Sequence, residues 1–213
     1  MSQEAVTAAL LVIGDEILSG RTKDKNIGYI AEYLTNIGID MKEVRVVPDE
    51  MDEIVAAVNV LRKRYTYLFT TGGIGPTHDD ITADCVAKAL GVSIDHDPRA
   101  VALLRERYPD PNDLNESRLR MARIPAGADL IDNPISKAPG FMVANVIVMA
   151  GVPSIMQAML ENVTPRLKTK YHAEVVPAMK KARAREAKLM EAVREMWPEL
   201  GPDDDPADAV IAE

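Results

Sequence analysis

The sequence has a single cysteine and few aromatic residues. Because Cys85 stands alone, an intrachain disulfide is excluded, and nothing else in the sequence indicates secretion. Aromatic residues make up only 4% of the chain, so a core must be built from Val, Ile, Leu, Met and Ala. The longest apolar runs, 8–13 and 141–152, are too short to span a bilayer, and the N-terminus lacks the positive region of a signal peptide. We therefore expect a cytoplasmic protein with no membrane partner.

A surplus of positive charge is also missing. Lys and Arg number 25 against 33 Asp and Glu, which gives a formal net charge of −8. An acidic chain repels the phosphates of nucleic acids unless it carries a local basic patch. The basic run at 180–188 is interrupted by Ala and Glu, which is typical of a solvated helix face. Nucleic acid is therefore excluded as an expected partner.

The first half of the chain alternates between strand and helix patterns. Its length of 213 residues and its hydrophobic content of 47% are sufficient for one well-buried domain, with room for an appendage. Residues 6–13 form a continuous apolar run, as in a strand buried on both faces of a parallel sheet. Strands are also predicted at 39–47 and 66–71, and helices at 25–37, after Pro48-Asp49 and up to Gly91. This order predicts a layered α/β domain with a mostly parallel sheet.

The pattern of strands and helices predicted for the second half of the chain is less regular. Helices are expected at 98–108 and 112–123, short strands at 128–132 and 141–149 with a turn at Ala144-Asn145, and a helix from Pro153 to about 168. From about 173 the pattern changes to an Ala/Glu/Lys/Arg-rich helix at 177–196 and an acidic tail from Gly201. We therefore expect an α/β domain over 1–170 and a helical extension with an acidic tail over 171–213.

The strongest functional signal is the glycine-rich segment 70–80, TTGGIGPTHDD. It follows an apolar strand and precedes a helix, at the edge where open α/β sheets bind ligands. Glycines at 72, 73 and 75 let the backbone approach a ligand and aim N–H groups at an anion. The segment is neither a Walker A loop nor a dinucleotide fingerprint, because the following residues and the spacing are wrong. A phosphate-binding loop is favoured over a plain turn.

Three aspartates stand near predicted helix starts. Asp79 and Asp80 follow the glycine loop, and Asp49 follows the second strand. Each either caps its helix or acts on a ligand, as a metal ligand or as a carboxylate that positions a reacting group. Loops after parallel strands emerge on one edge of a sheet, so Asp49 and Asp80 are expected to face one cleft.

The other candidate site residues also have purely structural interpretations. His78 lies in the loop, where a ligand role is possible, but a solvated side chain is favoured. Cys85 is interpreted as a core thiol. The segment 136–140, SKAPG, either closes over a phosphate or forms a hairpin-entry turn, and 115–120, NESRLR, is interpreted as surface.

Four stretches of the chain match a known family. They are Ile13–Gly20 with Asp24 and Asn26, then 70–84 (TTGGIGPTHDDITAD), 117–134 (SRLRMARIPAGADLIDNP) and 138–157 (APGFMVANVIVMAGVPSIMQ). With these motifs the chain resembles the molybdopterin-binding (MoaB/Mog-like) superfamily, most closely the amino-terminal domain of CinA-type competence/damage-inducible proteins. The related domain of some FAD synthetases is similar too.

The resemblance implies a three-layer α/β/α fold that binds molybdopterin or a nucleotide, in a homo-oligomer (dimer or trimer). It implies that Asp49 and Asp80 are catalytic and hold a divalent metal (Mg, Mn or Co). The implied phosphate-binding residues are Thr71, Gly72, Gly73, Ile74, Gly75, Ser136, Pro139 and Gly140. The implied supporting residues are Gly14, Asp15, Glu16, Asp24, Asn26, His78 and Asp79.

Three functions fit this resemblance. The first is binding of molybdopterin, or a related phosphate-bearing nucleotide ligand, in molybdenum-cofactor metabolism. The second is a metal-dependent pyrophosphatase that cleaves ADP-ribose or FAD, and the third is a non-catalytic regulatory module. Ile74 stands where molybdenum-cofactor proteins usually have Thr, which is CinA-like. The 213 residues leave no room for the deamidase domain of full CinA proteins, so nicotinamide-mononucleotide deamidation is not expected.

Overall fold

A computed structural model describes residues 5–110, 112–169 and the isolated positions 181, 185 and 188. The chain divides into two units, Met1–Lys170 and Tyr171–Glu213. The helix predicted at 177–196 and the acidic tail lie outside the described residues, apart from those three positions. Within the described part of the chain, no helix is long and apolar enough to cross a membrane.

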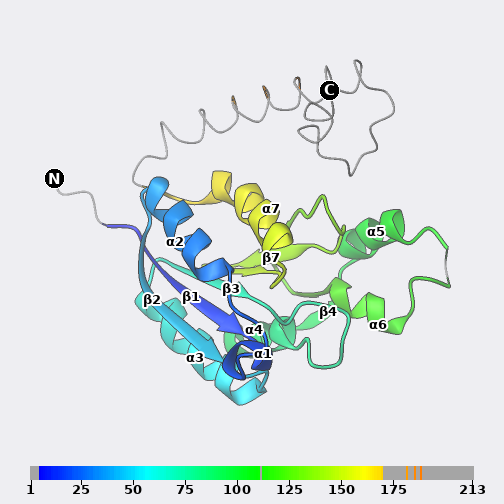
Figure 1. The fold of residues 1–213 in the computed structure, drawn as a ribbon. Helices are drawn as coiled ribbons and strands as arrows, with labels where there is room; N and C mark the ends of the chain where they lie inside the picture. Colours follow the sequence, from blue (N-terminus) through cyan, green and yellow to red (C-terminus); the bar gives the residue numbers. More distant parts are fainter. Residues whose placement is uncertain (1–4, 111, 170–180, 182–184, 186–187, 189–213) are drawn as a thin grey trace. The chain divides into compact units, whose positions relative to one another are not determined.

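A six-stranded sheet forms the centre of the first unit (Figure 1). Its strand order is β2-β1-β3-β8-β7-β6. Strands β2, β1, β3 and β8 are parallel to one another, whereas β7 is antiparallel to both of its neighbours. The strands are β1 (Thr7–Ile13), β2 (Asp40–Val47), β3 (Tyr67–Thr71), β6 (Asp129–Ile131), β7 (Gly140–Val143) and β8 (Val146–Met149). The expected mostly parallel sheet is confirmed.

Helices cover both faces of this sheet. In Figure 1, α2 (Asn26–Asn36) and α7 (Pro153–Val163) lie on one side, and α3 (Met51–Arg64) and α4 (Thr82–Leu90) lie on the other. Successive side chains of β1 point to opposite faces, so Ala9 and Leu11 join the core cluster with α3 and α4. All residues of β1 after Thr7 are buried, which explains the continuous apolar run. The layers are those of the predicted three-layer fold.

The prediction of a helix at 112–123 is wrong. Only α6 (Glu116–Leu119) is α-helical there, and a 3₁₀ turn, η1 (Arg120–Ala122), follows it. The chain then forms β5 (Arg123–Pro125), which pairs with β4 (Ile94–His96) in a separate two-stranded sheet. Ala122 and Ile124 are buried in the core cluster at strand spacing, and this burial overrides the local helical pattern. The preceding helix, α5 (Pro98–Arg107), was predicted.

The remaining late elements agree with the sequence. The antiparallel hairpin β7–β8 turns at Ala144, which has φ 51°, and at Asn145. The side-chain amide of Asn145 donates to the carbonyl oxygen of Arg62 at 2.8 Å, and this bond ties the turn to the end of α3. The last helix is shorter than predicted, because α7 passes at Thr164 into a 3₁₀ turn, η2 (Thr164–Arg166).

The topology brings four strand ends to one edge. Strands β1, β2, β3 and β8 run parallel, so the loops that begin at Gly14, Pro48, Gly72 and Ala150 all leave the same edge of the sheet. From β1 the chain passes to β2 on one side and then to β3 on the other. This reversal creates a topological switch point between β1 and β3, and such points are where open α/β sheets bind ligands.

Two glycine substitutions test the packing of β7. A Cβ at Gly140 would lie 2.4 Å from the carbonyl oxygen of Val148, so Gly140→Ala forces the hairpin apart and lowers the free energy of unfolding by about 2 kcal/mol. A Cβ at Gly28 in α2 would meet nothing within 4 Å, so Gly28→Ala is the control and stabilises by about 0.5 kcal/mol. Urea denaturation measures both. Equal stabilities for the two variants would contradict the close β7–β8 approach.

Candidate functional site

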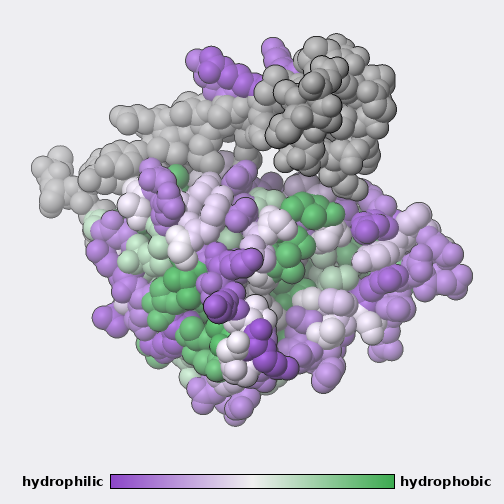
Figure 2. All heavy atoms as spheres, in the orientation of Figure 1, coloured by the Kyte–Doolittle hydropathy of each residue, from purple (hydrophilic) through white to green (hydrophobic). Residues whose placement is uncertain are grey.

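A groove of about 550 Å³ runs along the glycine-rich loop after β3. The loop residues 72–76 form one wall, and Asn133, Ser136 and Ala138 form another. The start of α7 closes it, with Val152, Pro153 and Ile155 in the lining. Figure 2 shows two hydrophobic areas on this face, one beside α7 and another over β1 and β2. The groove therefore combines a polar backbone wall with an apolar wall, as ligand sites commonly do.

The loop has its shape because two glycines take left-handed conformations. Gly72 has φ 99° and Gly73 has φ 67°. A Cβ at Gly72 would lie 2.1 Å from the carbonyl oxygen of Ile13, and a Cβ at Gly73 would lie 2.1 Å from Oγ1 of Thr82. Thr82 fixes the turn, since its hydroxyl donates to the carbonyl oxygen of Gly72 at 3.0 Å and its N–H to that of Gly73 at 3.0 Å. Only glycine fits at these two positions.

Three consecutive amides of this loop have no hydrogen-bond partner among the described residues. Within the described part of the chain, the N–H groups of Gly73, Ile74 and Gly75 donate no hydrogen bond, whereas that of Gly72 donates to the carbonyl oxygen of Met149 at 3.2 Å. All three residues line the groove. Successive backbone N–H groups in a tight turn form a concave site that attracts anions.

Asp80 holds the loop and does not cap the helix. Helix α4 begins at Thr82, and its N-cap residue Ile81 makes no side-chain cap bond. The Oδ2 atom of Asp80 accepts the backbone N–H of Thr77 at 2.8 Å and also the Thr77 hydroxyl. A Cβ at Gly75 would lie 2.7 Å from this oxygen, so Asp80 packs tightly under the loop. The capping alternative for Asp80 is therefore wrong.

Asp49 also makes a contact other than capping. Helix α3 begins at Met51 without a side-chain cap bond, and Asp49 Oδ2 accepts the backbone N–H of Asp15 at 2.9 Å. Burial raises the pKa of the Asp49 carboxyl above its ordinary value of 3.8. The hydrogen bond from Asp15 opposes this rise in pKa, and the nearby carboxylates of Asp15, Glu16 and Asp79 add to it. The protein thus keeps a carboxylate where its charge is disfavoured.

Asp49 and Asp80 line one small acidic pocket, as the topology predicted. This acidic pocket has a volume of about 180 Å³. It is lined by Ile13, Gly14, Glu16, Asp49, Gly73, Asp79 and Asp80. Glu16, Gly73 and Asp80 also line the groove, so the two spaces adjoin behind the glycine loop.

The donor set of the acidic pocket suits a hard cation. Carboxylate oxygens are the ligands that Mg²⁺ and Mn²⁺ prefer. The described residues contain no group of three or more side chains already placed to hold a metal ion. Mg²⁺ is commonly held by one or two carboxylates together with substrate phosphates, so Asp49 and Asp80 fit a metal that arrives with its ligand.

A second pocket opens from the groove on the side of β1 and α2. This side pocket has a volume of about 260 Å³. Asp24 and Asn26 line it together with Thr71 and Gly72. Asp24 caps α2, because its Oδ1 accepts the N–H groups of Asn26 at 3.0 Å and Ile27 at 2.7 Å. Asn26 donates to the carbonyl oxygen of Gly151 at 2.8 Å and so links α2 to the loop after β8.

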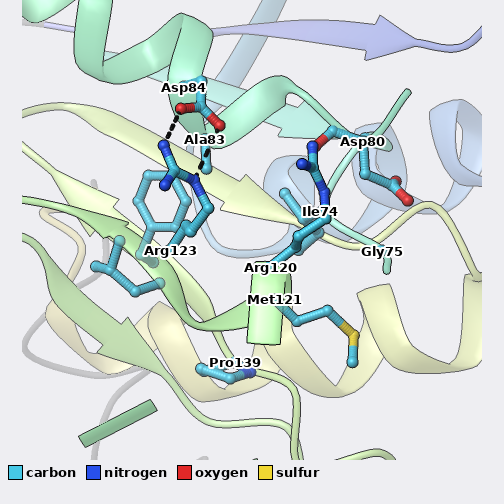
Figure 3. A pocket seen from close by; sticks show the side chains of 12 residues that line it. Ile74, Gly75, Asp80, Ala83, Asp84, Arg120, Met121, Arg123 and Pro139 are labelled. Carbon is cyan, nitrogen blue, oxygen red and sulfur yellow. Dashed lines mark hydrogen bonds and ion pairs between the residues drawn. The ribbon is translucent and has the colours of Figure 1, made fainter. Parts of the chain in front are cut away.

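Some of the other predicted site residues line the groove or its neighbouring cavities, and others do not. Ser136 lines the groove, and Pro139 lines a cavity of only about 10 Å³ behind the loop (Figure 3). Gly140 lines none of these spaces and instead packs against Val148. The side chain of His78 is 99% exposed, which fits the solvated alternative, and Asp15 contributes its backbone N–H to Asp49.

Sequence reasoning missed three contributors. Asn133 is buried and shapes the 133–139 loop, with its amide nitrogen donating to Ser136 Oγ and to the carbonyl oxygen of Ala138. Gly151 follows β8 at the same sheet edge as the glycine loop, and this second strand–glycine–helix junction was a usable signal. Arg120, interpreted as surface, lies beside Asp80 and Ile74 in Figure 3, and its guanidinium is 3.5 Å from the carbonyl oxygen of Asp80.

Solved structures with the same architecture are known. The crystal structure of the protein CinA, of unknown function, from Thermoplasma acidophilum superposes with a TM-score of 0.72 and 36% identity, over 76% of this chain and 98% of that one. The molybdopterin biosynthesis enzyme MoaB from Thermus thermophilus matches with a TM-score of 0.51 and 19% identity, over 76% and 91% of the two chains. The second match supports the fold alone.

Curated relatives are longer than this chain. A protein of Caldivirga maquilingensis is 37% identical over 166 residues, which are 76% of this chain and 65% of the relative. A protein of Thermoplasma acidophilum is 37% identical over 158 residues, which are 72% of this chain and 61% of the relative. The chain thus spans less than two thirds of the length of these relatives.

The family assignment rests on both the fold and the sequence. Residues 9–169 match the model described as "Probable molybdopterin binding domain", and they contain the glycine loop, both aspartates and all of the sheet except the first two residues of β1. The resemblance seen in the four sequence stretches, including its CinA-like character, is confirmed by these comparisons. The chain belongs to the family of probable molybdopterin binding domains, with a CinA protein and MoaB among its structural relatives.

Proposed function

We propose that the chain binds molybdopterin, or a related phosphate-bearing nucleotide ligand, in the groove beside the glycine loop. The observation that carries this proposal is a row of three groove residues, Gly73, Ile74 and Gly75, whose amides have no partner in the described part of the chain. Backbone N–H groups held in a rigid turn bind phosphate oxygens without reorganising. Family membership supports the class of ligand, and a role in molybdenum-cofactor metabolism is part of the proposal.

The charged residues of the groove limit the ways in which it can hold a phosphate. Its lining includes Glu16 and Asp80 but neither lysine nor arginine among the described residues. Carboxylates next to a phosphate repel it unless a cation lies between them. The loop amides supply one attraction, and a divalent metal would supply the other.

The acidic pocket favours a second candidate function, a metal-dependent pyrophosphatase that cleaves ADP-ribose or FAD. Asp49 and Asp80 would hold a Mg²⁺, Mn²⁺ or Co²⁺ ion in the acidic pocket. Such a metal, when bound, neutralises phosphate charge and activates water. The loop amides would orient the pyrophosphate, and Asp80, fixed by Thr77, would keep its carboxylate at the junction of the two spaces. In a dimer or trimer each subunit would carry one such site.

A ligand and metal panel separates these functions. Incubation with ADP-ribose or FAD and each metal, followed by chromatography for AMP, tests the pyrophosphatase, and calorimetric titration with molybdopterin or its adenylylated form tests binding. Asp80→Asn keeps an oxygen that can accept from Thr77 but removes the charge, so turnover should fall about 100-fold or more while the fold persists. Asp80→Ala should lose turnover and loosen the loop as well.

The panel can also reject the proposals. Full turnover by Asp80→Asn would show that other residues carry out the reaction. If no AMP is released with any of the metals, the pyrophosphatase function is rejected. If calorimetry likewise detects no ligand, only the non-catalytic regulatory module is left of the three functions.

The glycine loop can be tested with a matched pair of substitutions. Gly73→Ala places a methyl group 2.1 Å from Thr82 Oγ1 at a residue with φ 67°, so the loop must move and ligand affinity should fall at least about tenfold. Gly127 has φ 80° and open space around its Cβ position, so Gly127→Ala carries the same backbone strain away from the groove. Gly127→Ala should lose about 1 kcal/mol of stability and keep full affinity. Similar binding by both variants would contradict the role of the loop.

The acidic pocket predicts a gain in stability when a charge is removed. The folded pKa of Asp49 is raised, so its ionisation destabilises the fold at every pH above that value, and the effect vanishes below the unfolded value of 3.8. Asp49→Asn can still accept the Asp15 N–H bond and should raise Tm by roughly 1–2 °C at pH 7. Thermal melts from pH 7 to pH 3 should show this advantage fading. A lower Tm at pH 7 would contradict the electrostatic account.

A further inference from the structure

Strand β2 forms an open edge of the six-stranded sheet. It pairs with β1 and, within the described part of the chain, with no other strand. The carbonyl oxygen of Val47 accepts the N–H of Gly14 at 3.2 Å, so the backbone groups of Val47 face β1. Alternate residues of a parallel strand bond to the same neighbour, and the N–H and C=O groups of Val44 and Val46 therefore face outward. Such a row of unpaired backbone groups can pair with another strand.

Apolar side chains are exposed beside this edge. Val44, in the middle of β2, is 39% exposed, and Leu18, at the end of the short helix α1 (Asp15–Leu18), is 54% exposed. Val47 belongs to the core cluster with α3, so Val44 and Val46 point to the opposite face of the sheet. Figure 2 shows the hydrophobic area over β1 and β2. A long edge strand with an exposed apolar centre favours association with another chain.

The charges along β2 favour one register for pairing with a second copy. When two identical antiparallel strands meet on a two-fold axis, opposite side chains point to the same face, so one residue stands opposite its own copy. Lys42, Glu43 or Arg45 in that position would place two like charges opposite each other, which is destabilising. Val44 on the axis places valine opposite valine instead.

This register also pairs opposite charges. With Val44 on the axis, Glu43 stands opposite Arg45 of the partner subunit, and the symmetry repeats this pair on the other side of the axis. Within one subunit Glu43 already accepts from Arg45 at 2.6 Å and from the Tyr65 hydroxyl at 2.9 Å. These contacts hold the carboxylate at the edge before a second copy arrives.

The backbone geometry agrees with the same register. The outward N–H and C=O groups of Val44 would exchange two hydrogen bonds with those of its copy. Lys42 would stand opposite Val46, where its aliphatic stem can cover the valine while its exposed ammonium group stays in water. Pro48, which has no N–H, directly follows the strand and limits the pairing to β2.

We propose that the chain forms a symmetric dimer in which the β2 strands of two copies pair antiparallel, with Val44 on the two-fold axis. The two sheets then form one continuous sheet. Because the paired strands run in opposite directions, the ligand edges of the two sheets face opposite ways, and each subunit keeps its own groove. This interface does not depend on the identity of the ligand.

Sedimentation equilibrium of the full chain tests the interface. The wild type should have the mass of a dimer at high micromolar concentration. Val44→Lys places two ammonium groups opposite each other on the axis, so the dissociation constant of the dimer should rise at least about tenfold. Val60 is an exposed valine on α3, and Val60→Lys is the control that should leave the dimer intact.

A cysteine on the axis gives a second test that does not weaken the dimer. The Cα atoms of a hydrogen-bonded antiparallel pair lie about 5.5 Å apart, within the range that a disulfide spans. Mild oxidation should therefore convert Val44→Cys into a covalent dimer on a non-reducing gel, whereas Val60→Cys should stay largely uncrosslinked. The native Cys85 is buried and does not compete.

Three results would overturn the inference. One is a wild type that remains monomeric at every concentration. Another is a dimer that Val44→Lys leaves intact and Val44→Cys does not crosslink, because association then uses a different surface. The third is a trimer, since a two-fold interface of this kind closes with two subunits.

Discussion

The close approach of the backbone after β3 to the end of β1 determines the rest of the site. Gly72 lies so near the carbonyl oxygen of Ile13 that a single methyl group would overlap it, and the chain can make this turn only in a left-handed conformation. Thr82 fixes the same turn from below through two hydrogen bonds. Residues 73–75 line the groove, and their amides donate no hydrogen bond within the described part of the chain.

The parallel sheet explains why three spaces of different chemistry adjoin this turn. Loops after β1, β2, β3 and β8 leave one edge, and each contributes a distinct type of group. The loops after β2 and β3 bring the carboxylates of Asp49 and Asp80 into the acidic pocket, and the loop after β8 brings Gly151 to the side pocket. Burial and the neighbouring carboxylates of Asp15, Glu16 and Asp79 raise the pKa of Asp49 in this pocket.

The sequence predicted the features that depend on neighbouring residues. The apolar run of β1, the strand–glycine–helix context of the loop and the topology that brings Asp49 near Asp80 are all local or follow from a parallel sheet. The family motifs added the CinA-like character, which the comparisons confirmed. The proposed roles of individual site residues, the metal and the oligomeric state stay predictions.

Features that depend on distant contacts were missed. Nothing local distinguishes the capping of a helix by Asp80 from its bond to Thr77, since both need an acceptor at the end of a loop. The segment 112–123 was wrongly assigned to a helix, because burial of Ile124 against the core decides its conformation. Asn133 lines the groove because the 133–138 loop closes around its side chain, and the unmet bond of Asn26 is visible only in three dimensions.

The central claim is that the amides of Gly73, Ile74 and Gly75 hold the ligand phosphate, and NMR tests it most directly. Titration of ¹⁵N-labelled protein with inorganic pyrophosphate, without metal, should shift the amide proton resonances of these three residues downfield in a saturable manner, because each gains a charge-assisted hydrogen bond. The amide of Gly72, already bonded to Met149, should move least. Saturable shifts elsewhere with these three resonances unchanged would contradict the account.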